Sequence, residues 1–429
     1  MIAPKLKETV KKINIKLIIV IYILVFTISP FVQQATSRYL TTYFYMAIVV
    51  VTVAFTFVTC SIKNIREYIL LLIPFILFQS LDILMSPNNN ILLRGYQIVL
   101  FMLPVCLGFV IMKKYEKEGV GSNRLFTAVI ILTYMITLVT TIVGCINNPN
   151  AARVLATTAS SDDPTAVSYN WQNIGGFTFV YSCTLLYPLL VLSFKRRKLS
   201  LILVIAFAVA EFMLAINTEY TISLMLILFS SLLFFLPSNL TSKKFIIISV
   251  VAVVLVVVFS SLIAVLMQRV GEMIGNEVMA EKMTAVFSGK EAMDSMEDRR
   301  VDRYMLSLET FIKNPLFGSM FSGDMVKGGH SFVLDTLSQY GLVGGLLLGF
   351  MYWRIFRIFY KPFKDKLGFG FVIWLFIQPI VLSTLNTDMW LNNLCLFSPI
   401  MLISIFGVDD PIDKDNKKRK SILLRLPFS

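Results

Sequence analysis

Apolar stretches of about 20 residues recur along almost the whole chain, and they constrain its fold more than any other feature. About 20 apolar residues is the length that an α-helix needs to cross a lipid bilayer. Within the bilayer each backbone N–H and C=O needs a partner in its own segment, so such runs are expected to be helices. We place candidate spans at residues 17–36, 42–60, 66–85, 91–112, 125–145, 174–194, 199–216, 218–236, 244–267, 331–355, 367–384 and 390–407. The sequence therefore predicts an all-α, polytopic membrane protein with about twelve transmembrane helices.

Composition and charge agree with this fold class. The chain is 56% apolar and 15% charged, whereas soluble domains are about 25% charged. If the N-terminus is cytoplasmic, most of the 39 lysines and arginines fall in inner loops and tails, as the positive-inside rule requires. We therefore expect a multi-pass protein of the cytoplasmic membrane. The net charge of +13 is explained by basic loops beside membrane lipids, and it calls for no nucleic-acid partner.

The pattern divides the chain into three regions. Residues 1–267 form a transmembrane scaffold of about nine helices, and residues 331–429 contain the last spans and a basic cytoplasmic tail. Between them, residues 268–330 are polar and have an amphipathic helical pattern. This segment is expected to form a cap of helices on the outer, extracytoplasmic face. The five cysteines lie within or at the ends of apolar spans and predict no disulfide framework.

The end of this outer segment carries the chain's most distinctive residues, including its only histidine, His330. A helical pattern precedes it and ends at Asn314-Pro315, because proline cannot continue a helical hydrogen-bond ladder. A glycine-rich turn then leads back to His330. One helix face has Val301, Met305, Leu308 and Ile312, and another has Arg300, Arg303 and Ser307.

These residues can bind and process an anionic lipid headgroup. Arginine holds phosphate oxygens by paired hydrogen bonds, and it could stabilise a departing diphosphate without a metal or any other cofactor. His330 could accept the proton of an attacking sugar hydroxyl. By residue type alone, a lone histidine at a helix start and a run such as DRRVDR are more often structural. The chain shows no nucleotide-binding, serine-hydrolase or metal-ligand motif.

Three other ionisable residues are weaker candidates. Arg153 is the one basic residue of the outer loop at 146–173, and Arg299 adjoins Arg300. Glu211 is a carboxylate within a predicted span, where charged residues are commonly functional. It could equally pair with an arginine of the outer vestibule.

The region also resembles a known family. Arg300, the NPLFG sequence at 314–318, a glycine-containing connector and HSFVLDTLSQYGLVG from His330 resemble the signature of the O-antigen ligase and Wzy-type polysaccharide polymerase superfamily. The large outer loop before a late span and the expected twelve spans also match. The chain departs from the usual pattern at Ser319-Met320 and at Ser331.

The resemblance implies a GT-C-like glycosyltransferase that needs no metal and faces outward. Its substrate would be an undecaprenyl-diphosphate-linked oligosaccharide, polymerised with inversion into O-antigen or capsular polysaccharide for the cell envelope. His330 corresponds to the family's essential histidine, and Arg300 to the arginine near the diphosphate. Helix geometry alone adds Arg303, and loop position alone adds Arg153. A chain-length regulator and a flippase would be its partners. A ligase remains an alternative with the same chemistry, and a lipid-linked oligosaccharide flippase or transporter is an alternative of another class.

Overall fold

The computed structural model describes the chain over most of its apolar helices and over the residues around His330. It covers residues 15–39, 47, 50, 62–85, 103–115, 123–148, 151–157, 163–196, 199–218, 220–232, 243–244, 247, 265, 269, 298–322, 326–367 and 369–406. In these residues the regular structure is entirely helical, as the sequence predicted.

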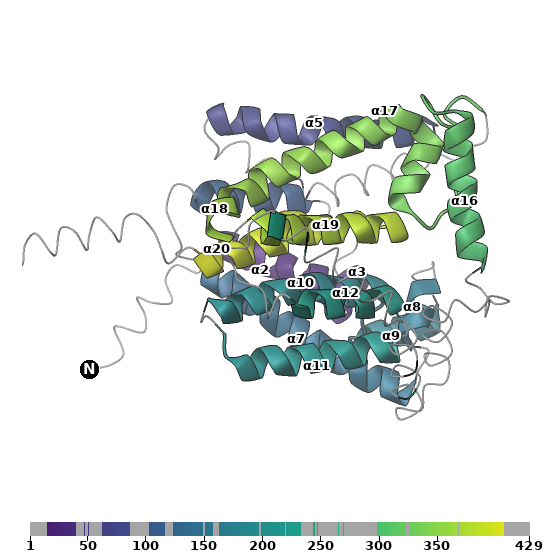
Figure 1. The fold of residues 1–429 in the computed structure, drawn as a ribbon. Helices are drawn as coiled ribbons and strands as arrows, with labels where there is room; N and C mark the ends of the chain where they lie inside the picture. Colours follow the sequence, from purple (N-terminus) through teal and green to yellow (C-terminus); the bar gives the residue numbers. More distant parts are fainter. Residues whose placement is uncertain are drawn as a thin grey trace, which may run out of the picture.

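Most of the long helices run side by side in one direction and form a bundle (Figure 1). On one side lie α5 (Ile62–Met85) and α17 (Phe332–Ile355), followed by α19 (Phe369–Leu385) and α20 (Ser398–Phe406). On the other side lie α12 (Thr221–Ser231), α7 (Asn123–Asn147) and α11 (Leu201–Asn217). Between them, α10 (Phe177–Lys195) is buried along almost its entire length. A helix that is apolar all round is expected in such a central position.

The lengths of the helices support a membrane protein. Three described helices are long and apolar enough to cross a membrane: Arg124–Asn147, Phe177–Lys195 and Phe332–Phe363. A bent pair, Leu17–Ile28 with Pro30–Tyr39, would make a fourth. Four shorter apolar helices accompany them: Leu201–Asn217, Ile222–Ser231, Gly370–Leu385 and Asn393–Phe406. The spans expected at 42–60 and 244–267 lie almost wholly outside the described residues, so the count of twelve stays a prediction.

The first expected span, at 17–36, is broken. Helix α2 (Ile15–Ile28) is followed by α3 (Pro30–Tyr39), which is turned by 112°. Pro30 cannot donate the next helical hydrogen bond. Asn173 fixes the break, because its side-chain oxygen accepts hydrogen bonds from the Ser29 hydroxyl (2.8 Å) and from the Phe31 N–H (3.2 Å). Hydropathy alone could not show this partner.

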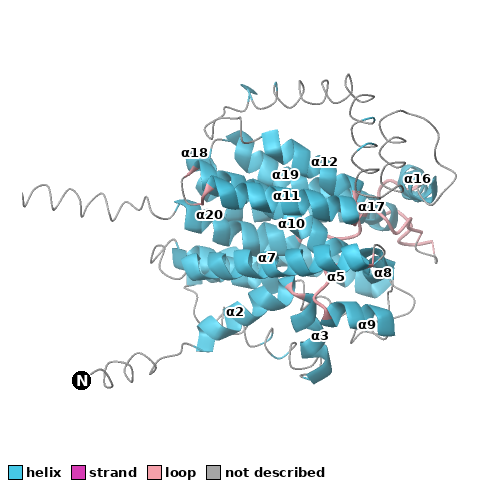
Figure 2. Ribbon diagram, turned by 90° about the horizontal axis from the view of Figure 1, so that it is seen from below, coloured by secondary structure: helices cyan, strands magenta, loops and turns pink. Residues whose placement is uncertain are grey.

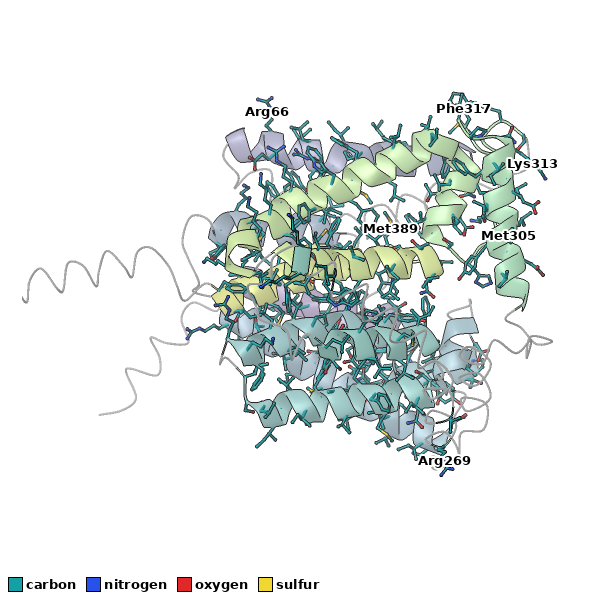
Figure 3. The ribbon with its side chains drawn as sticks, in the orientation of Figure 1. Arg66, Arg269, Met305, Lys313, Phe317 and Met389 are labelled. Carbon is teal, nitrogen blue, oxygen red and sulfur yellow. The ribbon has the colours of Figure 1, made fainter. Side chains whose placement is uncertain are left out.

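The two ends of the bundle differ in character. At one end, which we call the Arg66 end, cationic side chains meet backbone carbonyls: Arg196 donates to the Lys366 carbonyl, and Lys366 to the Phe406 carbonyl. The short helices α8 (Ala151–Thr157) and α9 (Pro164–Trp171) and the helix α16 (Asp298–Lys313) all lie at the other end (Figures 1 and 2). We call this the α16 end. Figure 3 shows Arg66 far from Met305, Lys313 and Phe317, which mark the α16 end.

Candidate active site at the α16 end

Helix α16 lies across the end of the bundle instead of joining it. In Figure 1 it runs roughly perpendicular to α17 and α19, and in Figure 2 it is seen nearly end-on. The Tyr304 hydroxyl donates to the Leu385 carbonyl at the end of α19 (2.9 Å), which ties the helix to the bundle. A helix so placed would lie parallel to the plane of a membrane that the bundle spans.

The NPLFG sequence after α16 fits into a break in α17. At Gly341 the backbone leaves helical geometry, with φ 59° and ψ −150°. A Cβ atom there would be 2.4 Å from the Leu316 carbonyl, so the turn approaches too closely for any residue but glycine. Three backbone hydrogen bonds join turn and break: Ser319 N–H to Ser338 C=O (2.8 Å), Leu342 N–H to Pro315 C=O (2.8 Å) and Val343 N–H to Leu316 C=O (3.3 Å). Two of the sequence signatures, NPLFG and GLVG, thus form one structural unit.

A second close approach positions the residues before His330. A Cβ atom on Gly328 would be 2.1 Å from the Arg303 carbonyl oxygen, so this turn runs directly against α16. Ser307 accepts from the Gly328 N–H (2.9 Å) and donates to Asp335 (2.7 Å). The same oxygen of Asp335 accepts from the Gly329 N–H (3.2 Å). Asp335, in the first turn of α17, therefore holds α16 and the turn together.

These contacts bring His330 to Arg303. Arg303 Nη1 and His330 Nε2 are 2.5 Å apart, although the residues are 27 positions apart in the sequence. A guanidinium group can only donate, so Nε2 accepts and the proton of the neutral imidazole is on Nδ1. Arg303 is exposed and His330 is half-buried, so a ligand can reach both. The arrangement places a permanent cation beside a group that can take up a proton.

The two faces of α16 point in unexpected directions. The Arg303 and Ser307 face meets the protein, and Ser307 is 1% exposed. The apolar face, by contrast, is open: Met305 is 47% exposed and Ile312 is 65% exposed. Arg303 is exposed, as the usual interpretation of the DRRVDR run as a solvated face expects, and its guanidinium group also contacts His330. An amphipathic helix with its apolar side outward is suited to a membrane surface.

The other predicted site residues do not all join this pair. Arg300 and Arg299 lie in the first turn of α16, one turn or less before Arg303, but their side chains lie outside the described part. Arg153 lies in α8 at the same end of the bundle, and its side chain is likewise not described. Glu211 is completely buried in α11, on the side of the bundle away from α17 (Figure 1). No described arginine forms an ion pair with Glu211, and the side chains of Arg153, Arg299 and Arg300 lie outside the described part, so both alternatives for Glu211 stay predictions.

A polar cavity lies within the bundle near the break between α2 and α3. It has a volume of about 300 Å³ and is lined by polar side chains that include Gln33, Thr178, Asp388, Asn392 and Asn393. An adjoining cavity of about 240 Å³ shares several of these residues. Burial raises the pKa of the Asp388 carboxyl. Hydrogen bonds from the backbone N–H groups of Trp390 and Met389 lower this pKa, but the effect of burial is larger. The cavity offers amide, hydroxyl and carboxyl groups, which suit the hydroxyls of a sugar.

Sequence reasoning missed two residues that organise these sites. Asp335 stands in the HSFVLD sequence, but nothing in its spacing shows that it contacts Ser307. Asp388 follows the last long helix in a short NTDMW connection, and only the return of that connection into the bundle places it in a cavity. In Figure 3, Met389 lies well inside the bundle.

Comparison with known proteins adds no family to these observations. No protein-family model matches the chain, and no curated protein matches it significantly. Within the described part, no three His, Cys, Asp or Glu side chains gather in a way that could hold a metal ion. The candidate function therefore depends on the residues themselves and on their geometry.

Proposed function

We propose that this chain is a polysaccharide polymerase, which joins oligosaccharide repeat units carried on a polyprenyl diphosphate. The contact between Arg303 and His330 is the observation that carries the proposal. The signature from Arg300 to the GLVG sequence supports it, because two of its pieces, NPLFG and GLVG, pack together and join the end of α16 to α17. In this proposal the protein has about twelve spans, and the α16 end faces outward from the cytoplasmic membrane.

The proposed reaction is a displacement at the anomeric carbon. The acceptor hydroxyl oxygen forms a bond to that carbon, while the bond from the carbon to the diphosphate oxygen breaks and its electron pair stays on the diphosphate. The hydroxyl proton passes to His330. Arg303, with Arg300 one turn before it, stabilises the negative charge on the leaving diphosphate. No metal is needed for this step, since two arginines can supply the charge.

The hydrogen bond between Arg303 and His330 suggests how substrate binding starts the reaction. While Arg303 donates to Nε2, this nitrogen cannot accept a proton. A diphosphate competes strongly for the guanidinium group, because a hydrogen bond to an anion is stronger than one to a neutral imidazole. Donor binding would thus draw Arg303 away and free the base. The exposed apolar face of α16 would lie on the membrane beside the prenyl chain of the donor.

The decisive experiment uses purified protein, synthetic undecaprenyl-diphosphate repeat units and EDTA. Wild type should form a polymer ladder, and His330→Ala and Arg303→Ala should lose it. Lys313→Ala is the matched control, because Lys313 is an exposed cation on the same helix that pairs only with Glu309 among the described acids (3.7 Å). The control should keep its activity. Full activity of His330→Ala in a folded protein would refute the mechanism, and transfer of single units to another acceptor would indicate a ligase.

A transporter or flippase for the same lipid-linked oligosaccharide is the second candidate. Transporters commonly have broken helices around a binding site within the membrane. The 112° break between α2 and α3, close to the cavity that contains Asp388, is such a feature. In a strain that lacks this chain, lipid-linked single repeats facing outward would indicate a missing polymerase. Repeats that face inward would indicate a missing flippase.

A further inference from the structure

The Arg66 end contains a basic pocket that takes no part in the proposed reaction. The pocket has a volume of about 440 Å³ and lies between α5, the helix at 103–115 and the end of α17. Its charged lining residues are Arg66, Glu67, Lys113, Arg354 and Arg357. Helix α17 begins beside His330, bends at Gly341 and runs on to this pocket, and the apolar helix Phe332–Phe363 is long enough to cross a membrane. The pocket and His330 thus lie at opposite ends.

The charges in this pocket are unbalanced. Lys113 forms an ion pair with Glu67, the only acid that lines the pocket (2.8 Å). No described carboxylate forms an ion pair with Arg66, Arg354 or Arg357, so three guanidinium groups surround the space with no ion-pair partner among the described residues. Such a concentration of positive charge attracts an anion, and guanidinium groups suit the oxygens of a phosphate.

Arg354 is a buried cation of this pocket whose hydrogen bonds are largely unmet. This side chain is 8% exposed, and its Nε atom has no hydrogen-bond partner among the described residues. Its Nη2 atom makes one long hydrogen bond, to the Glu67 carbonyl (3.4 Å). Burying a charged group with unmet hydrogen bonds is costly. An anion in the pocket would satisfy the group that the protein leaves unsatisfied.

The surroundings indicate that the anion belongs to a lipid. Trp353 is 47% exposed beside the pocket, and its ring lies 5.8 Å from the Arg354 guanidinium carbon and 5.5 Å from that of Arg357. An exposed tryptophan at the end of an apolar helix is typical of the membrane–water interface, where lipid headgroups lie. Below the pocket, α5 presents an open apolar stripe: Leu70 lines the pocket and is 38% exposed, followed by Ile73 (42%) and Leu77 (50%). A headgroup in the pocket would have its acyl chains along this stripe.

We propose that this pocket binds the phosphate headgroup of an anionic membrane lipid, in the leaflet opposite to the one that α16 faces. The lipid phosphate contacts Arg354 and Arg357, Arg66 closes the open side, and the acyl chains lie on α5. The site holds α5 and α17 together at the end where the two helices bring like charges close to each other.

The test measures lipid binding by delipidated, full-length protein in a neutral detergent. Phosphatidylglycerol should bind and raise the melting temperature, and phosphatidylcholine should do neither. The double variant Arg66→Gln, Arg357→Gln is used because both side chains are exposed and folding should tolerate their loss. Each exposed cation is worth about fivefold in binding to an anionic lipid surface, so loss of both should weaken phosphatidylglycerol binding by about twenty-five-fold.

Lys364→Gln is the matched control, since Lys364 is an exposed cation near the same end but does not line the pocket. Its affinity for phosphatidylglycerol should match wild type. Equal loss in the control and the double variant would show a diffuse charge effect and overturn the proposal. Unchanged affinity in the double variant would do the same. A third arm adds inorganic phosphate: displacement of phosphatidylglycerol by millimolar phosphate would show a site for the free ion and not for a lipid.

Discussion

Replacing Gly341 with alanine tests whether the NPLFG turn and the break in α17 form one unit. The backbone at Gly341 has φ 59°, in the left-handed region, where a residue with a side chain is strained by about 1–3 kcal/mol. The new Cβ would also lie 2.4 Å from the carbon and oxygen of the Leu316 carbonyl, which cannot rotate away as a side chain could. The turn must therefore move off α17.

Movement of the turn weakens the three backbone hydrogen bonds between the NPLFG turn and the break in α17. Loss of one or two costs about 0.5–1.5 kcal/mol each. Strain and lost hydrogen bonds together predict that Gly341→Ala lowers the free energy of unfolding by roughly 2–5 kcal/mol. Gly349→Ala is the matched control in the same helix, because nothing lies within 4 Å of its added Cβ. At position 349, alanine should raise the free energy of unfolding slightly, by about 0.5–1 kcal/mol.

Two measurements check this prediction. Thermal unfolding in detergent should show a lower melting temperature for Gly341→Ala than for Gly349→Ala. Hydrogen exchange should be faster at Ser319, Leu342 and Val343, whose N–H groups join the turn to the helix. If Gly341→Ala unfolds at the temperature of the control and keeps the exchange protection of wild type, the NPLFG turn and the break in α17 do not form one unit.

Three further predictions concern the site and its support. Gly328→Ala should displace His330 from Arg303, since the added Cβ would lie 2.1 Å from the Arg303 carbonyl oxygen. The rate of the proposed glycosyl transfer should fall about tenfold to a hundredfold. Lys327→Ala changes an exposed neighbour and should keep its activity. Asn173→Ala removes four side-chain hydrogen bonds, two at the break between α2 and α3 and two to α7, and should lower the free energy of unfolding by about 2–4 kcal/mol. Asn170→Ala, whose side chain makes one long hydrogen bond to Gln34, should lower it by under about 1 kcal/mol in the same thermal unfolding measurement. Asp388→Asn should flatten the dependence of stability on pH. Because the folded-state pKa of Asp388 is raised, protonated Asp388 stabilises the wild-type fold below about pH 4, and this stabilisation is lost as the pH rises through the folded-state pKa. Melting temperatures of the two proteins between pH 4 and pH 8 would show the difference. Parallel curves would contradict this prediction.

Sequence patterns predicted the helical class and the position of several long helices. Expected spans at 125–145 and 174–194 correspond to α7 and α10 within a few residues at each end. The end of α16 at Lys313 agrees with the stop expected at Asn314-Pro315. The common face of Arg303 and Ser307 was also predicted correctly, because helical periodicity fixes which residues share a face.

The same patterns could not predict how segments meet. The break at Ser29 depends on Asn173, far away in the sequence, and hydropathy gives no sign of it. Helical periodicity identified two faces of α16 but not which one meets the protein, since that depends on the Gly328 turn and on Asp335. The sequence predicted that Glu211 lies within a span, but only the packing of the helices shows that α11, which carries it, lies on the other side of the bundle from α17.

What the sequence by itself determined is therefore local: apolar length makes helices, and proline and glycine end or bend them. Tertiary structure alone decided which residues work together. His330 contacts Arg303, Asp335 contacts Ser307, and three arginines from α5, from α17 and from directly after α17 line one pocket. The physical reason is that these contacts form between residues distant along the chain, and their geometry is set by close backbone approaches at Gly328 and Gly341 that no periodicity records.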